Sequence, residues 1–222
     1  MTVITISREL GSEGDSIANL VSKTLNYRFI DKVFVGNVLS QYGLVEFDTE
    51  YDTLPSFWEK FNAQKEERRE MMVDLLNQVI RAVAQQGDVI ILGRSGFAIL
   101  NNYFDVLNLR IQAPFNLRMK RIMVRKNITA FEAEKLVRKG DKLRSSFIKS
   151  FYGVNWDISS PFDLIIDTGK VPPDIGAKCI VVIVKALKER DILGETSTSD
   201  IQVDPILKIA VSSELAKLDG AY

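Results

Sequence analysis

The polar segment Ser7–Ser16 holds the residues whose types and spacing best suit phosphate chemistry. It follows the apolar, β-branched run Thr2–Ile6 and precedes apolar side chains at helical spacing, so a buried strand, a short turn and a helix are expected. In phosphate loops of the pattern GxxxxGK[ST], glycines let backbone N–H groups converge on phosphate oxygens. The lysine of that pattern neutralises the phosphates, and the hydroxyl ligates Mg²⁺.

The segment departs from that pattern and above all lacks its lysine. Aligned on Gly11-Ser12, it has Arg8 and Glu13 at the two glycines, Gly14 at the lysine and Asp15 at the hydroxyl residue. A helix N-terminus still favours an anion, and Arg8 could supply the positive charge. The candidate donor-phosphate residues are Arg8, Gly11, Ser12, Gly14, Asp15 and Ser16. An ordinary βα turn in which Asp15 caps the helix fits the same residues.

Positive charge is concentrated in one block of a chain whose formal net charge is zero. Between Val106 and Ser150, twelve Lys/Arg residues face three Asp/Glu residues, a net of +9. Arg118, Arg121 and Arg125 share one helix face, and Arg138 and Arg144 lie on a second expected helix. Arginine forks suit phosphates bidentately, whereas a solvated surface accounts for most of the lysines. Nucleic-acid binding is a competing reading, which the pI of about 6.4 and the lack of a known module argue against.

A further arginine stands where open α/β sheets bind ligands. The run Val89–Leu92 is the strongest core-strand candidate and leads into Gly93-Arg94-Ser95-Gly96. Arg94 would then lie at the carboxyl end of a parallel strand, between glycines that allow close approach of a substrate. A loop arginine in a surface ion pair is the alternative.

Composition excludes several kinds of chemistry. The 222 residues include no histidine, so His-based triads, His general bases and His-containing zinc sites are impossible. The single Cys179 cannot form an intramolecular disulfide and is expected to be a buried structural thiol. Chemistry that depends on positioning and electrostatics, of which phosphoryl transfer is the leading case, remains compatible.

Strands and helices alternate along the chain, which predicts an α/β fold with a five-stranded parallel sheet and helices on both faces. Val106–Ile111 and Phe162–Asp167 supply the last two strands, and Tyr27–Asp31 the second. A loop is expected from Tyr42 to Pro55. Further helices are expected at 16–25, 33–39, 71–84, 97–100 and 173–188, and the charged stretch 59–70 is expected to be exposed.

The tail beyond Asp191 has a different character. Gly194–Ser199 has the composition of a linker, and a helix capped by Asp204 with Pro205 at its first position should follow. The apolar side chains of this helix could dock on the domain or on a partner, and the sequence leaves both open.

Several stretches, taken in order, resemble the cytidylate kinase-like family. They are Ile4–Ser12, Gln78–Ile80, Gly87–Arg94, Ala113-Pro114 with Arg118 and Arg121, Asp141–Arg144, Gly153–Asp157 and Phe162–Gly169. The resemblance covers about Thr2–Leu187. It implies a nucleoside monophosphate kinase fold in residues 1–190, with a monophosphate-binding segment at about 42–86 and a lid at about 114–152. Residues 191–222 lie outside it.

The resemblance also implies roles for single residues. Gly11 and Ser12 would lie in the donor-phosphate loop, and Arg94, with Ser95 beside it, would meet the acceptor nucleotide. Catalytic roles would fall to Arg118, Arg121 and Arg144, which reach the phosphates from the lid, and to Asp141, which orients a lid arginine or the acceptor. Cytidylate kinases have a lysine and an aspartate where this chain has Gly14 and Ser95. An acidic side chain at Glu13 would repel a triphosphate unless Mg²⁺ or an arginine compensates.

The leading hypothesis is therefore a cytoplasmic kinase that uses ATP and Mg²⁺ to phosphorylate CMP or a related pyrimidine nucleotide. The alternatives are a nucleotide-binding regulatory module without phosphate transfer and a kinase for another small molecule. No stretch approaches the roughly 20 apolar residues of a membrane span, and no leader is apparent. Nucleotides are the expected partners. A homodimer, or a partner for the C-terminal helix, is left open.

Overall fold

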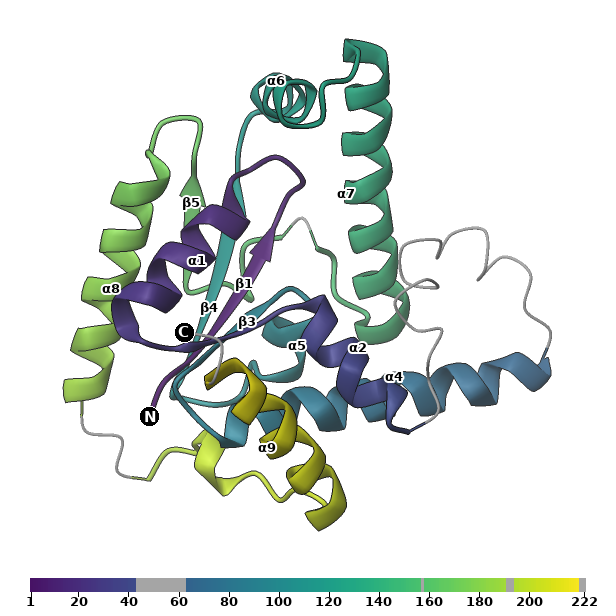
Figure 1. Ribbon diagram of the computed structural model, residues 1–222, viewed down its shortest axis with the longest axis vertical. Coiled ribbons are helices and arrows are strands. Elements are labelled where there is room, and N and C mark those ends of the chain that lie inside the picture. Colours follow the sequence, from purple (N-terminus) through teal and green to yellow (C-terminus); the bar gives the residue numbers. More distant parts are fainter. Residues whose placement is uncertain (43–62, 157, 191–193, 220–222) are drawn as a thin grey trace.

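The computed structural model describes residues 1–42, 63–156, 158–190 and 194–219. Its five strands form one parallel sheet in the order β2-β3-β1-β4-β5 (Figure 1). The strands are β1 (Val3–Arg8), β2 (Arg28–Ile30), β3 (Val89–Leu92), β4 (Val106–Gln112) and β5 (Leu164–Asp167). The predicted five-stranded parallel α/β fold is confirmed.

Helices cover both faces of this sheet. They are α1 (Gly14–Leu25), α2 (Lys32–Ser40), α4 (Ala63–Gln85), α5 (Gly96–Ile99), α6 (Phe115–Lys126), α7 (Ala130–Tyr152), α8 (Pro173–Glu189) and α9 (Pro205–Asp219). Helices α1 and α8 pack together on one face, and α4 and α5 lie on the other, with α2 against α4 (Figure 1).

The alternation of side chains along β1 shows how one strand serves both layers. Ile4 and Ile6 are fully buried in the apolar cluster under α1 and α8, whereas Val3 is buried in the cluster under α2 and α4. A strand that is buried on both faces has no side exposed to solvent, which explains why most positions of these strands are apolar. The rigid sheet fixes the carboxyl ends of β1, β3 and β4 next to one another.

The two basic helices predicted from the charge pattern are present as α6 and α7. They pack against each other around a separate small cluster of Ile122, Ala133 and Val137. Thr129 caps α7 through a capping box with Glu132, which defines where the second helix begins. The far end of α7 returns to the main core, where Phe147 and Ile148 are buried.

The C-terminal helix α9 docks on the domain. Leu207, Val211 and Leu215 are buried against α2 and α4. Asp204 caps α9 as predicted, because its Oδ1 accepts hydrogen bonds from the N–H groups of residues 206 and 207 at 2.9 and 3.0 Å. The cap follows from the short polar start of the helix, whereas docking on the domain is shown only by the structure.

Two expectations for the C-terminal part of the chain, one for the run Gly194–Ser199 and one for Cys179, were wrong. Within the run expected to be a linker, Thr198 is fully buried, and its N–H and Oγ1 donate to the Asp105 carboxylate at 2.8 and 2.5 Å. A short 3₁₀ turn at Thr198–Asp200 makes this contact possible. Cys179 was expected to be buried, but it is exposed, because its neighbours Ala177 and Ile180 occupy the face of α8 that meets the sheet.

The loop expected at 42–55 lies outside the described residues except for its first residue, and so does the start of the charged stretch 59–70. The division of the chain into a monophosphate-binding segment at about 42–86 and a lid at about 114–152 stays a prediction. Within the described parts of the chain, no helix combines the length and the apolar character that a membrane crossing requires.

Candidate functional site

The turn after β1 is tight and depends on a glycine. Gly11 adopts φ +83°, and a Cβ there would lie 2.8 Å from the carbonyl oxygen of Arg118, so only glycine fits. Ser12 is fully buried, and its N–H and hydroxyl both donate to the Glu9 carbonyl, at 3.2 and 2.8 Å. Ser12 therefore shapes the turn with its polar groups. Helix α1 begins at Gly14, directly after the turn.

Asp15 does not cap α1, so the interpretation of this segment as a simple capped turn was wrong. The N-cap residue is Glu13, in a left-handed conformation with φ 65° and no side-chain cap bond. Asp15 lies in the first turn of α1 and pairs with Nε of Arg8 at 3.1 Å. Ser16 donates its hydroxyl to Glu13 at 3.0 Å. The acidic groups of the loop are thus occupied by neighbouring donors.

Glycines on two elements make room for the Arg8 side chain. A Cβ on Gly14 would lie 2.6 Å from Cβ of Arg8, and a Cβ on Gly93 would collide with its Nη1. The Arg8 side chain therefore runs from the end of β1, past the start of α1, to the end of β3. Gly14 occupies the position of the lysine in the phosphate-loop pattern. Because glycine has no side chain, the Arg8 side chain fills the space beside it.

Three arginines from separate parts of the chain meet at one small cavity. Arg8 is the last residue of β1, Arg94 follows β3, and Arg144 lies on α7. All three line the cavity together with Ser95 and Trp156. The volume of about 30 Å³ suits a water molecule or one phosphoryl oxygen, and it is too small for a pyrimidine ring. Their convergence places three guanidinium groups together at the carboxyl edge of the sheet.

The turn that presents Arg94 is strained. Gly93, Arg94 and Ser95 have φ values of 74°, 49° and 59°, so two residues with side chains occupy the left-handed region in succession. Such conformations cost of order 1 kcal/mol or more each and cluster at functional sites. Ser95 is 3% exposed, and its hydroxyl has no hydrogen-bond partner within the described residues. This buried hydroxyl and the strain both favour a binding role for the turn.

Three arginines on one face of α6 contact the turn after β1, each at a different residue of the turn. Arg118 donates to the Leu10 carbonyl at 3.3 Å, and Arg121 donates to the Gly11 carbonyl at 3.3 Å. Arg125 completes the row with an ion pair to Glu13 at 2.6 Å. The spacing of these three arginines, read from the sequence as one helix face, therefore matches contacts to successive parts of the loop.

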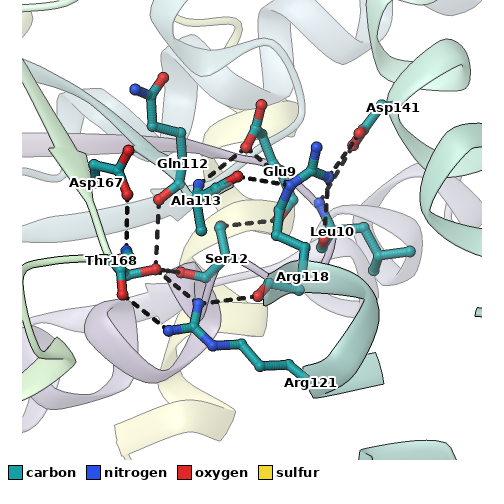
Figure 2. A network of polar contacts seen from close by, with 12 residues as sticks. Glu9, Leu10, Ser12, Gln112, Ala113, Arg118, Arg121, Asp141, Asp167 and Thr168 are labelled. Carbon is teal, nitrogen blue, oxygen red and sulfur yellow. Dashed lines mark hydrogen bonds and ion pairs between the residues drawn. The ribbon is translucent and has the colours of Figure 1, made fainter. Parts of the chain in front are cut away.

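Arg121 also joins the loop to the end of β5. It donates to Oγ1 and to the carbonyl oxygen of Thr168, at 2.8 and 2.9 Å, and Thr168 in turn donates to the Ser12 carbonyl at 2.8 Å (Figure 2). Asp141 accepts from Arg118 Nη1 at 2.7 Å and lies 3.9 Å from Arg144. The structure thus brings all the predicted site residues to the carboxyl edge of the sheet. Contact of the lid arginines with phosphates stays a prediction.

The sequence assigned no role to four residues near this site, which are Glu9, Arg110, Trp156 and Thr168. Glu9 lies between two buried arginines, Arg110 and Arg118, at 3.6 and 3.2 Å. Trp156 stacks with its ring 4.5 Å from Arg110 and donates Nε1 to the Ser7 hydroxyl at 2.9 Å. Thr168 is the fourth. Glu9, Trp156 and Thr168 lie inside the quoted family stretches, and Arg110 lies inside the expected strand Val106–Ile111. No local pattern pointed to a role for them, because most of their partners are 46 or more residues away along the chain.

A larger hollow of about 1030 Å³ lies at the opposite edge of the sheet, where Arg28 begins β2 and Asp88 precedes β3. Its lining includes Tyr27 and Glu214 but none of the predicted site residues. The larger hollow therefore does not include the residues that the sequence singled out, whereas Arg8, Arg94, Ser95 and Arg144 line the smaller cavity.

Comparison with known proteins identifies relatives of this chain. Over most of its length the chain is similar to the cytidylate kinase of Sulfurisphaera tokodaii, with 24% identity over 181 residues, 80% of this chain and 92% of that protein. The cytidylate kinase of Methanocaldococcus jannaschii is 24% identical over 170 residues, 76% of this chain and 89% of that protein. A crystal structure of an uncharacterized protein from Eubacterium ventriosum shares the fold, with a TM-score of 0.64, 20% identity, and coverage of 84% of this chain and 99% of that one.

The sequence model described as "Cytidylate kinase-like family" matches residues 3–170. The match includes the loop after β1, the strained turn at Arg94, both basic helices and Thr168. It ends before α8 and leaves the docked C-terminal segment outside. The chain belongs to the cytidylate kinase-like family.

Proposed function

We propose that this protein transfers the γ-phosphoryl group of ATP, bound with Mg²⁺, to a pyrimidine nucleoside monophosphate such as CMP. The observation that carries the proposal is the cavity shared by Arg8, Arg94 and Arg144 beside the glycine turn. A donor and an acceptor phosphate repel each other, and a cluster of guanidinium groups offsets this repulsion. Membership of the family and the similarity to archaeal cytidylate kinases support the same reaction.

The reaction requires no protein base. The acceptor phosphate is already ionised at neutral pH, so one of its oxygens forms the bond to the γ-phosphorus while the bond from that phosphorus to the β–γ bridging oxygen breaks. Catalysis then consists of in-line positioning, neutralisation of charge and exclusion of water. Arg94 and Arg144 would hold the acceptor phosphate, and Arg8 would take over the charge of the missing lysine.

The described residues fit a donor that brings its own metal ion. No group of three or more acidic, His or Cys side chains suited to hold a metal occurs among them, so a resident metal site is not indicated in that part of the chain. Mg²⁺ commonly binds through one or two carboxylates together with substrate phosphates and waters. Asp15, whose side chain is 56% exposed at the start of α1, would be the carboxylate for this purpose.

The acceptor site differs from that expected of a cytidylate kinase in one respect. Ser95 replaces an aspartate, so the described lining offers guanidinium and hydroxyl donors but no carboxylate to accept from the cytosine amino group. One oxygen of the acceptor phosphate would enter the small cavity. This difference favours a kinase for another small molecule as the second candidate function.

A phosphotransfer assay on the full chain tests the proposal. Coupled ADP release would be measured with ATP, Mg²⁺ and a panel of CMP, dCMP, UMP, AMP and non-nucleotide alcohols and acids, with calorimetry for ATP and CMP in parallel. Turnover that depends on CMP or UMP is expected. Tight ATP binding without turnover on any acceptor would favour the regulatory module, and turnover restricted to a non-nucleotide acceptor would favour the second candidate.

A further inference from the structure

The carboxylate of Glu9 occupies a central position that the proposed reaction does not explain. Its Oε2 accepts a hydrogen bond from the Ala113 N–H at 3.1 Å and lies 3.2 Å from Nε of Arg118. Its Oε1 lies 3.6 Å from Nη2 of Arg110. The side chains of the two arginines are only 6–7% exposed, so Glu9 supplies negative charge where two buried positive charges need it.

Arg118 connects Glu9 to Leu10 in the turn after β1. Its Nε also donates to the Ala113 carbonyl at 3.0 Å, and its Nη1 donates to the Leu10 carbonyl at 3.3 Å and to Asp141 at 2.7 Å. The second oxygen of Asp141 accepts from the Leu10 N–H at 3.4 Å. Leu10 is therefore held at both of its backbone polar groups by side chains from α6 and α7, as Figure 2 shows.

We infer that Glu9 is a positioning residue, which fixes the Arg118 guanidinium and through it the Leu10 backbone at the entrance of the loop. The guanidinium is a rigid planar fork, so fixing Nε at Glu9 and Ala113 also fixes the direction of Nη1. Leu10 immediately precedes Gly11, whose φ of +83° defines the turn. A shift of Leu10 would change the direction of the N–H groups that follow it, so that they would no longer point at the donor phosphates.

The inference rests on the proposed function for its kinetic part only. A displacement of about 1 Å in a phosphate-binding group can reduce turnover by about 100-fold. A purely structural ion pair would instead change the stability of the protein and leave its affinity for ATP unchanged. The two roles therefore differ in what they do to donor binding.

The first test compares the parent with Glu9→Gln, which keeps the shape of the side chain but removes its charge. The expected result is a 10- to 100-fold fall in kcat/KM for ATP, with the KM for the acceptor within about twofold of the parent. Glu134→Gln is the matched control, because Glu134 forms an exposed ion pair with Arg138 on α7, and it should behave as the parent. Equal ATP kinetics in the parent and Glu9→Gln would overturn the inference.

A double-mutant cycle tests whether Glu9 acts through Arg118. If it does, Glu9→Gln should add little, less than about twofold in kcat/KM for ATP, to the loss in Arg118→Lys, which keeps the charge but not the fork. The same cycle with Asp141→Asn serves if Arg118→Lys does not fold. Fully multiplicative losses would show that Glu9 acts independently of Arg118 and would overturn the inference.

Amide hydrogen exchange without nucleotide, together with ATP calorimetry, separates this inference from the proposed function. Glu9→Gln should speed exchange at the Leu10 amide at least 10-fold and weaken ATP binding, while Glu134→Gln should do neither. If the parent binds ATP but transfers no phosphate, these two effects support the inference while the kinase proposal fails. Faster exchange with unchanged ATP affinity overturns the inference and leaves the kinase proposal standing.

Discussion

Arg125 on α6 lies 2.6 Å from the Glu13 carboxylate at the start of α1, and the two side chains form an ion pair. Glu13 was the residue of the loop hardest to reconcile with a bound triphosphate. Its charge is offset by Arg125 and by the Ser16 hydroxyl, which donates to its second oxygen at 3.0 Å. The two side chains, which lie 112 residues apart in sequence, thereby join α6 to the start of α1.

Replacement of Glu13 by glycine should improve ATP binding. Glu13→Gly removes a negative charge beside the donor phosphates, releases Arg125 and relieves the left-handed backbone at φ 65°. We expect the Kd for ATP, measured by calorimetry, to fall about 3- to 10-fold, which corresponds to roughly 1 kcal/mol. Glu13→Gln separates the charge from the backbone strain. Weaker ATP binding by both variants would contradict a donor site at this turn.

Arg94→Ala should weaken acceptor binding. The buried Arg94 lines the small cavity, and loss of a charge-assisted contact with the acceptor phosphate costs about 1.5–3 kcal/mol. The KM for the acceptor should rise at least 10-fold while the KM for ATP changes by less than twofold. Arg138→Ala removes an exposed arginine from α7 and is the control. An unchanged acceptor KM in Arg94→Ala would place the acceptor elsewhere.

Arg121→Ala should mainly lower turnover. Arg121 ties the Gly11 carbonyl to Thr168, so its loss frees the loop at the point where it must hold the transition state. We expect kcat to fall 10- to 100-fold in steady-state assays with both substrates saturating. Thr168→Val, which removes the hydroxyl that Arg121 contacts, should give a smaller loss that does not add fully to it. Lys126→Ala, an exposed change at the end of α6, should be silent. A wild-type kcat in Arg121→Ala would refute this role.

Gly14→Ala should be destabilising although Gly14 has ordinary helical geometry. The new Cβ would lie 2.6 Å from Cβ and 2.9 Å from Cγ of Arg8, atoms too close to the backbone to move aside easily. Overpacking of this kind costs about 1–3 kcal/mol, and the displaced Arg8 should also lower ATP affinity. In Gly176→Ala, the matched control, the nearest atom would lie at 3.4 Å, an ordinary contact. Equal melting temperatures and ATP affinities for the two variants would argue against the described path of Arg8.

The docking of α9 should depend on pH through the Glu214 carboxylate. Burial alone would raise its pKa, but hydrogen bonds from Lys217 and from Asn37 on α2 outweigh burial and hold the pKa below its usual value. A lowered carboxyl pKa stabilises the fold above the unfolded pKa of about 4.3, and this stabilisation disappears as the pH falls through the folded pKa. Glu214→Gln should therefore lose about 1 kcal/mol of unfolding free energy at pH 7 relative to the parent, and the difference should shrink below about pH 4. Denaturant titrations at pH 7, 5 and 3.5 measure it. A difference that is constant with pH would be inconsistent with this origin.

The strands and the arginine row were predictable because their signals are local. Val89–Leu92 is a continuous apolar run and forms a strand with the same bounds, since a strand covered on both faces needs no polar positions. Arg118, Arg121 and Arg125 share a helix face through spacing alone. Cys179 shows the limit of this reasoning, because its apolar surroundings in sequence did not reveal that it lies on the outer side of α8.

The sequence by itself determined the order of strands and helices, the position of the glycine turn and the excess of positive charge between Val106 and Ser150, because each depends on neighbouring residues. Only the tertiary structure decided the partners of the charges. Asp15 pairs with Arg8 instead of capping its helix, Arg125 neutralises Glu13, and Glu9 faces two arginines more than 100 residues away along the chain. The parallel sheet brings the carboxyl ends of distant strands together, and long-range Coulomb and hydrogen-bond partners follow from that packing.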